Sequence, residues 1–181
     1  MLALSSCYPG GPTVPKTNAS GQPVLSMARF CGPETYEIED AQWNLYRDEE
    51  DGVMTLWLSV QCGAAIRQCK DTEDIGGEPD WELNLVVPKL TRSELVPGFK
   101  ASIPVGYDDA QGGWITNFYF SEHNGSDKNT IEILEEDGTR LRIRITGEII
   151  DVNYYDDSKP KSKLVVETWF EQDPDGQRTM S

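Results

Sequence analysis

The chain has 181 residues and a formal net charge of −15, because 31 Asp and Glu residues outnumber 16 Lys and Arg residues. The length favours one domain with a core of useful size. The charge argues against nucleic acid and anionic membranes as partners, since both are bound through Lys and Arg, and no apolar run is long enough to cross a bilayer. Protein, carbohydrate and cationic partners are compatible with such a surface.

The first 33 residues are rich in proline and glycine, which predicts an irregular arm or tether over 1–33. Residues 4–7, LSSC, resemble the cleavage box of bacterial lipoproteins, in which the cysteine becomes the lipidated first residue. We therefore take Cys7 as a candidate lipidation site, and we favour the cell envelope or a secreted location over the cytoplasm. Residues 24–30, VLSMARF, predict a short edge strand.

Residues 35–47 and 53–62 predict a long hairpin, closed by an acidic turn that ends in Gly52. Alternate residues of its second strand are apolar and are expected to face the core: Met54, Leu56, Leu58, Val60 and Cys62. Trp57 lies on the opposite face, among small polar residues. Such a Trp either stacks on a ligand or is covered by another segment. We expect the arm to cover it, and we keep Trp57 as a candidate binding residue.

A long connection is expected over 63–80, with room for one helical turn at 64–68 before the glycines at 76 and 77. A strand is predicted at 81–88. Residues 91–94, TRSE, match a helix capping box, which indicates a short helical turn there.

Two more strands are predicted in the middle of the chain. Residues 98–105 contain Pro104, which has no N–H to donate, so this strand is expected at an edge. Residues 114–121, WITNFYFS, carry aromatic side chains on both faces and are expected to be covered on both.

The clearest strand signal is 140–150, RLRIRITGEII, in which apolar residues alternate with Arg, Thr and Glu. We predict that it pairs with 130–135 through a three-residue loop that ends in Gly138. Apolar residues then face apolar residues, and acids face bases. The predicted pairs are Ile133 with Leu141, Ile131 with Ile143, and Glu132 with Arg142.

Residues 163–171, KLVVETWFE, predict the last strand, and 172–181 form a tail. Glu167 and Trp169 share one face of this strand. Trp169 is the second candidate binding residue. Most other acids lie in turns, so Glu167 is the first candidate for carboxylate catalysis, although we interpret it as one charge on an outer face.

The four cysteines leave two interpretations. Cys62 and Cys69 bracket a short span that suits a small-loop disulfide, while Cys7 and Cys31 have no obvious mates. Buried free thiols are the alternative. A zinc site is not predicted, because the cysteine spacing is too wide and the only histidine, His123, is distant. Ser121 and Asp127 flank this histidine, but a triad needs a base oriented by a buried partner, so catalysis is not expected there.

Calcium is the one metal that the sequence suggests, because carboxylates gathered in loops suit a hard cation. Asp173 and Asp175 alternate before a glycine and are the preferred candidate ligands. Further acidic clusters lie at 48–51, 108–109 and 156–157. No other cofactor is predicted, since motifs for phosphate or dinucleotide binding are missing.

Short strand-forming runs separated by Gly, Pro, Asn and Asp predict an all-β fold. We expect an antiparallel β-sandwich of about eight strands over 34–171, with a closed β-barrel as second choice. For function we favour a non-catalytic binding or assembly domain, in a cell-envelope lipoprotein if Cys7 is lipidated. The alternatives are a carboxylate-dependent, glycoside-type hydrolase and a calcium-stabilised binding module.

Overall fold

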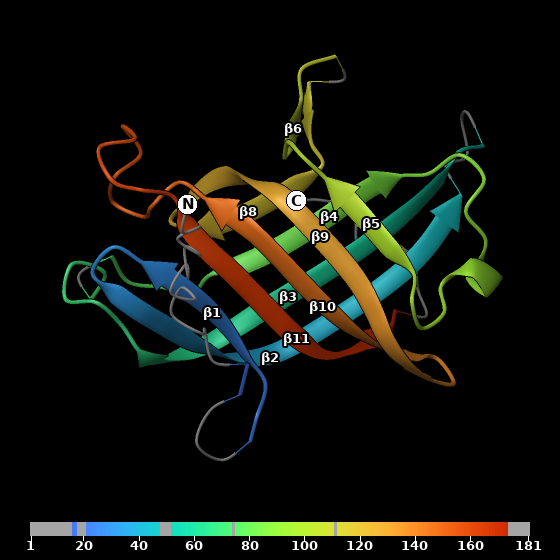
Figure 1. The fold of residues 1–181 in the computed structure, drawn as a ribbon, viewed down its shortest axis with the longest axis horizontal. Coiled ribbons are helices and arrows are strands. Elements are labelled where there is room, and N and C mark those ends of the chain that lie inside the picture. Colours follow the sequence, from blue (N-terminus) through green and yellow to red (C-terminus); the bar gives the residue numbers. More distant parts are fainter. Residues whose placement is uncertain (1–15, 18–20, 48–51, 74, 111, 174–181) are drawn as a thin grey trace, which may run out of the picture.

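Nine strands form one large, mainly antiparallel sheet in the computed structural model, which describes residues 16–17, 21–47, 52–73, 75–110 and 112–173 (Figure 1). The expected all-β fold is confirmed. The strands of this sheet are β1 (Val24–Arg29), β2 (Gly32–Arg47), β3 (Met54–Arg67), β4 (Asp80–Val86), β5 (Lys100–Ile103), β8 (Thr116–Phe120), β9 (Glu122–Asp137), β10 (Arg140–Ile149) and β11 (Ser162–Gln172). A second, two-stranded sheet joins β6 (Tyr107–Asp108) to β7 (Gly113–Trp114) and stands off the main body.

The large sheet runs in the order β10-β11-β1-β2-β3-β4-β8-β9-β5, and β9 also pairs with β10. In Figure 1 the sheet is strongly curved, so that β9, β10 and β11 pass over β2, β3 and β4. The strand predicted at 24–30 is present, but its predicted place at an edge is wrong. β1 pairs with β11 on one side and with β2 on the other. Nearly all of β1 is buried, so its backbone N–H and C=O groups need hydrogen-bond partners on both sides. β5 does lie at an edge, as Pro104 indicated, and pairs only with β9.

The core lies between the two halves of the curved sheet and is filled by the apolar face of each strand. The alternation predicted for β10 is confirmed, since Leu141, Ile143, Ile145 and Ile149 are buried and the Arg residues between them are not. Trp43 and Trp81 are the largest fully buried side chains of this core.

In the hairpin of β9 and β10, the side chains lie on the predicted faces of the sheet, but the pairing register differs from the predicted one. Its turn is shorter by one residue, because Asp137 pairs with Arg140 across Gly138 and Thr139. A bulge at Leu134 then sets Ile133 opposite Ile143 and Glu132 opposite Arg144. The register is two residues from the predicted one, and an even shift leaves every apolar residue on the core face.

Two local expectations are wrong. Residues 64–67 are the end of β3 and not a helical turn, since pairing with β2 continues as far as Arg67. The aromatic strand is covered on one face only: Phe118 and Phe120 are buried, whereas Tyr119 is 39% exposed. The capping box is confirmed, because the Glu94 side chain accepts from the Thr91 backbone N–H at 2.8 Å at the start of the 3-10 turn η1 (Arg92–Glu94).

Candidate functional site

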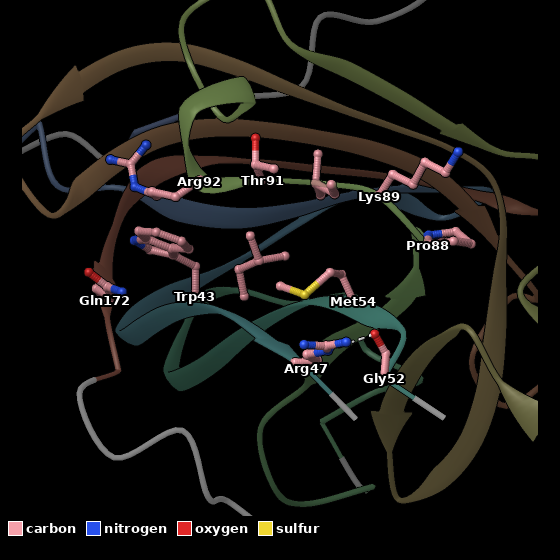
Figure 2. A pocket seen from close by; sticks show the side chains of 11 residues that line it. Trp43, Arg47, Gly52, Met54, Pro88, Lys89, Thr91, Arg92 and Gln172 are labelled. Atoms are coloured by element: carbon pink, nitrogen blue, oxygen red, sulfur yellow. Dashed lines mark hydrogen bonds between the residues drawn. The ribbon is translucent and has the colours of Figure 1, made fainter. Parts of the chain in front are cut away.

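A pocket of about 560 Å³ opens where β2 and β3 meet the connection that follows β4 (Figure 2). This volume lies within the range of about 300–1,000 Å³ that ligand pockets usually span. The lining residues are Trp43, Leu45, Arg47, Gly52, Met54, Pro88, Lys89, Leu90, Thr91, Arg92 and Gln172. Three of these described lining residues are cationic: Arg47, Lys89 and Arg92.

Trp43 lies beneath the pocket and supports its floor. Its side chain is fully buried, and its indole Nε1 donates to the Thr139 carbonyl at 2.8 Å. The Arg92 guanidinium stacks over the ring at 5.1 Å from the centroid. Arg92 also binds Glu136 at 2.6 Å and the Leu95 carbonyl at 3.0 Å. The positive charge of Arg92 is therefore already paired, and its role is to hold the indole in place.

Arg47 and Lys89 stand at the rim of the pocket, and both are exposed. Arg47 Nε donates to the Gly52 carbonyl at 3.0 Å, the one contact drawn between lining residues in Figure 2. Gly52 has a φ of 72°, a left-handed value that favours glycine. Lys89 has no hydrogen bond or ion pair with any residue that the structure describes. These two cations thus have no acidic partner among the described residues.

The two tryptophans predicted as binding residues do not line this pocket. Trp57 is 8% exposed, and its Nε1 donates to Glu82 at 2.6 Å, as suits a covered Trp. Trp169 is half-buried, with the Arg140 guanidinium 5.2 Å from its ring. Trp43 was not singled out because a strand residue on the core face looks like any other core aromatic.

The exposed aromatic side chains lie elsewhere. Tyr107 and Trp114 come from the β6–β7 hairpin, with ring centroids 4.7 Å apart and exposed fractions of 38% and 39%. Tyr119 lies 4.7 Å from the His123 ring. Asp127 binds Lys161 at 2.7 Å and the Gly106 N–H at 3.0 Å, so it does not orient His123 as a triad would require.

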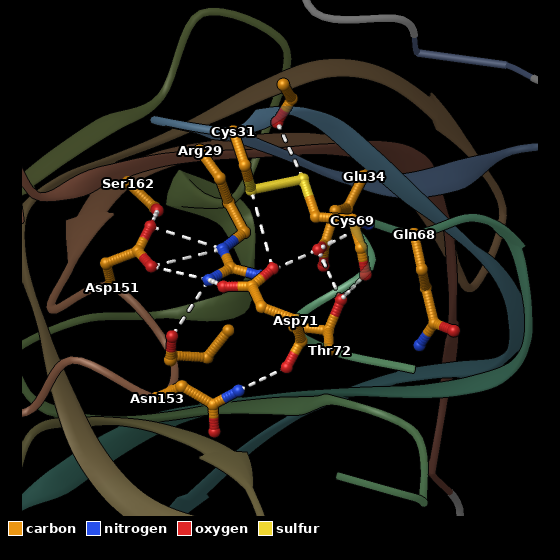
Figure 3. Close-up of polar contacts among 12 residues, drawn as sticks. Arg29, Cys31, Glu34, Gln68, Cys69, Asp71, Thr72, Asp151, Asn153 and Ser162 are labelled. Carbon is orange, nitrogen blue, oxygen red and sulfur yellow. Dashed lines mark hydrogen bonds and ion pairs between the residues drawn. A yellow bond between two sulfur atoms is a disulfide. The ribbon is translucent and has the colours of Figure 1, made fainter. Parts of the chain in front are cut away.

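A buried charge network surrounds Arg29 at the end of β1 (Figure 3). The guanidinium binds Asp151 at 2.6 Å, Glu34 at 2.8 Å and Asp71 at 3.0 Å. Burial alone would lower the pKa of Arg29, but hydrogen bonds and charge from Asp151 and Glu34 outweigh it and raise that pKa.

The carboxylates of this network also accept hydrogen bonds from other groups of the fold. Glu34 accepts from Thr72 at 2.6 Å and Tyr36 at 2.9 Å, and Asp151 accepts from Ser162. Because every charged group is occupied within the fold, the network is structural.

The disulfide predicted between Cys62 and Cys69 is wrong. Cys69 is bonded to Cys31, beside the Arg29 network, and Cys62 is a buried free thiol in β3. Burial raises the pKa of Cys62, with a further contribution from the charge of Asp80. β3 continues past Cys62 to Arg67, so the span to Cys69 is extended strand and not the compact loop that a short disulfide needs.

Potential metal ligands gather at one place in the described part of the chain. Cys31, Glu34, Cys69 and Asp71 bring their ligand atoms within 4.8 Å of one another. The two sulfurs form a disulfide and both carboxylates bind Arg29, so the donors are already used. Asp173 is half-buried, and its backbone N–H donates to the Trp43 carbonyl at 2.9 Å. Asp175, residues 48–51 and Cys7 lie outside the described residues, so the calcium and lipidation sites stay predictions.

Glu167 lies on the outer face of β11, as interpreted from the sequence, but it is paired and not isolated. It accepts from Lys16 at 2.6 Å, Arg142 at 2.7 Å and Arg144 at 2.9 Å. Burial alone would raise the pKa of the Glu167 carboxyl, but the hydrogen bonds and charges of Lys16 and Arg144 lower it to about 2. A carboxylate held ionised in this way is unsuited to act as a general acid at neutral pH.

Within the described residues, no helix has the length and apolar character needed to span a bilayer. Comparisons with protein-family models, with curated proteins and with solved structures each found no match.

Proposed function

We propose that the chain is a non-catalytic binding domain whose ligand site is the pocket beside Trp43. The observation that carries this proposal is the pocket itself: partly exposed apolar side chains of Leu45 and Met54, a buried Trp43 beneath them, and a few charged groups at the rim. Concave, mainly apolar sites with a small number of polar groups are the usual form of small-molecule sites.

The hydrolase alternative has less support. A glycosidase needs two carboxylates about 5–9.5 Å apart across its cleft, and the described lining of this pocket holds cations instead. Glu167, the carboxylate that the sequence singled out, is bound to three cations on the outer face of β11.

A neutral apolar fluorophore, N-phenyl-1-naphthylamine, tests the binding proposal. Its emission should rise on titration with the full chain and saturate at one site. Met54→Trp fills the pocket and should abolish this binding, whereas Val105→Trp, at a 57% exposed position away from the pocket, should not. The proposal fails if the fluorophore shows no saturable binding, or if both variants bind like the parent chain.

A further inference from the structure

The disulfide between β1 and the end of β3 lies among groups that zinc binds (Figure 3). Two sulfurs and two carboxylates bring their ligand atoms within 4.8 Å of one another: those of Cys31, Glu34, Cys69 and Asp71. The Cα atoms of the two cysteines are 6.2 Å apart, although 38 residues separate them in the chain. Thiolates and carboxylates are ordinary zinc ligands. This cluster shares no residue with the described lining of the pocket beside Trp43.

Asp71 is the carboxylate of this cluster that can take a further partner. Glu34 is fully buried, and its Oε1 accepts from Arg29 at 2.8 Å and from the Cys69 N–H at 2.9 Å. The Asp71 side chain is 28% exposed, and its Oδ1 lies 3.7 Å from Cys31 Sγ. Cys31 is exposed as well. Cys31 and Asp71 thus lie on the solvent side of the network, whereas Glu34 holds Arg29 from the inside.

We infer that reduction of the disulfide converts this place into a zinc site held by Cys31, Cys69 and Asp71, with water as the fourth ligand. A dithiol supplies the two electrons and two protons. Its thiolate attacks the exposed Cys31 Sγ, the Cys69 thiolate leaves, and the second thiol of the reductant closes its own disulfide and releases Cys31. Both cysteine thiols give their protons to solvent when they bind Zn²⁺. Three protein ligands and one water complete a tetrahedral site.

The charge balance favours zinc over other ions at this place. The disulfide is neutral, and Zn²⁺ with two thiolates is also neutral, so the exchange leaves the charge beside Arg29 unchanged. Calcium avoids thiolates, and without them it would add two positive charges next to the guanidinium. Arg29 also donates to Asp71 Oδ2 at 3.0 Å. A hydrogen bond of this kind orients a metal-binding carboxylate from the second coordination sphere.

Cobalt(II), a spectroscopic substitute for zinc, tests the site in the full chain. The chain is reduced with a phosphine, freed of it without oxygen, and titrated. One equivalent should produce sulfur-to-cobalt charge-transfer absorption and the strong visible bands of tetrahedral cobalt, and zinc should displace it. The oxidised chain should show neither. Zinc should also raise the unfolding midpoint of the reduced chain, because it binds the folded state, and should leave that of the oxidised chain unchanged.

Variants locate the ligands. Cys7→Ser with Cys62→Ala removes the two other thiols and should keep the charge-transfer band, whereas Cys31→Ser in that background should remove zinc binding. Asp71→Asn should weaken zinc binding by at least about tenfold. The matched control is Glu73→Gln, which removes the same charge from an exposed position outside the cluster and should bind zinc like the parent chain.

Three results would overturn the inference. Equal zinc binding by the reduced and oxidised chains would place the ion on surface carboxylates. A charge-transfer band that survives Cys31→Ser would place it on other thiols. Equal affinities of Asp71→Asn and Glu73→Gln would remove Asp71 from the ligand set. If Asp71→Asn does not fold, Asp71→His carries this last test, because histidine is itself a zinc ligand. Retained binding in Asp71→His supports the site, and lost binding overturns it.

Discussion

Arg29 and Arg47 are two arginines that differ in what surrounds the guanidinium group. Around Arg29, three carboxylates and the Val152 carbonyl accept from one guanidinium whose side chain is fully buried. Around Arg47 and Lys89, the described neighbours offer a single carbonyl, that of Gly52. A charge with a complete set of partners can only hold the fold together. The side chains of Arg47 and Lys89 are instead exposed to solvent.

The strongest test of this contrast removes Arg29. Arg29→Leu leaves Glu34 and Asp151, both fully buried, without their cation, and breaking a buried pair from one side costs about 3–5 kcal/mol. Urea unfolding at neutral pH measures the loss. Arg140→Leu, at an exposed cation that pairs with Asp137, should leave the unfolding midpoint almost unchanged. Equal effects of the two substitutions would contradict the structural role of the network.

The disulfide beside the network gives the next largest effect. Cys31 and Cys69 are 38 residues apart, and closing a loop of that length stabilises a fold by up to about 4 kcal/mol in the chain-entropy view. Reductant should therefore lower the unfolding midpoint of the parent chain and of Cys62→Ala. It should have no effect on the variant that carries both Cys31→Ala and Cys69→Ala. Peptide mapping without reductant should join the segments around residues 31 and 69, and a fragment joining 62 to 69 would refute the pairing.

The sequence could predict features that depend on local patterns, but not those that depend on contacts between distant residues. Strands such as β10 were predictable because apolar and polar residues alternate along consecutive positions. The register of its hairpin was two residues off because Gly138 suits a two-residue loop as well as a three-residue one, and because Leu134 forms a bulge that its sequence does not indicate. The Arg29 network was not predictable, since Arg29 and Asp151 are 122 residues apart and only the strand order brings them together. The pocket escaped prediction for the same reason: Arg47, Lys89 and Gln172 come from three distant segments.

The surroundings of Arg47 can be tested by changing the backbone conformation at Gly52. Gly52 and Gly138 have φ values of 72° and 62°, and a side chain at such a position costs about 1–2 kcal/mol. A Cβ at Gly52 would come 2.9 Å from Arg47 Nη2, whereas one at Gly138 would meet nothing within 4 Å. Gly52→Ala and Gly138→Ala should thus lose similar stability, but only Gly52→Ala should displace Arg47 and change the binding of N-phenyl-1-naphthylamine. Unchanged fluorophore affinity in Gly52→Ala would show that the position of Arg47 does not affect the pocket.

Glu167 tests whether the number of ionic partners or the burial of those partners determines how much a charged group stabilises the fold. It has three cationic partners, as many as Arg29 has carboxylates, but those partners are 34–47% exposed. The pKa of Glu167 is about 2, below the usual 4.5, so its contribution to stability is complete above pH 4.5 and is lost as the pH falls toward 2. Because solvent screens the pairs, we expect a contribution of only about 1 kcal/mol.

The variant Glu167→Gln measures this contribution directly. At about pH 6 it should be less stable than the parent chain by about 1 kcal/mol, and at about pH 3 the difference should shrink by about half as the parent begins to protonate. Urea midpoints at both pH values give the two differences. A loss near that of Arg29→Leu would mean that partner number outweighs burial, and a difference that grows as the pH falls would contradict the lowered pKa of Glu167.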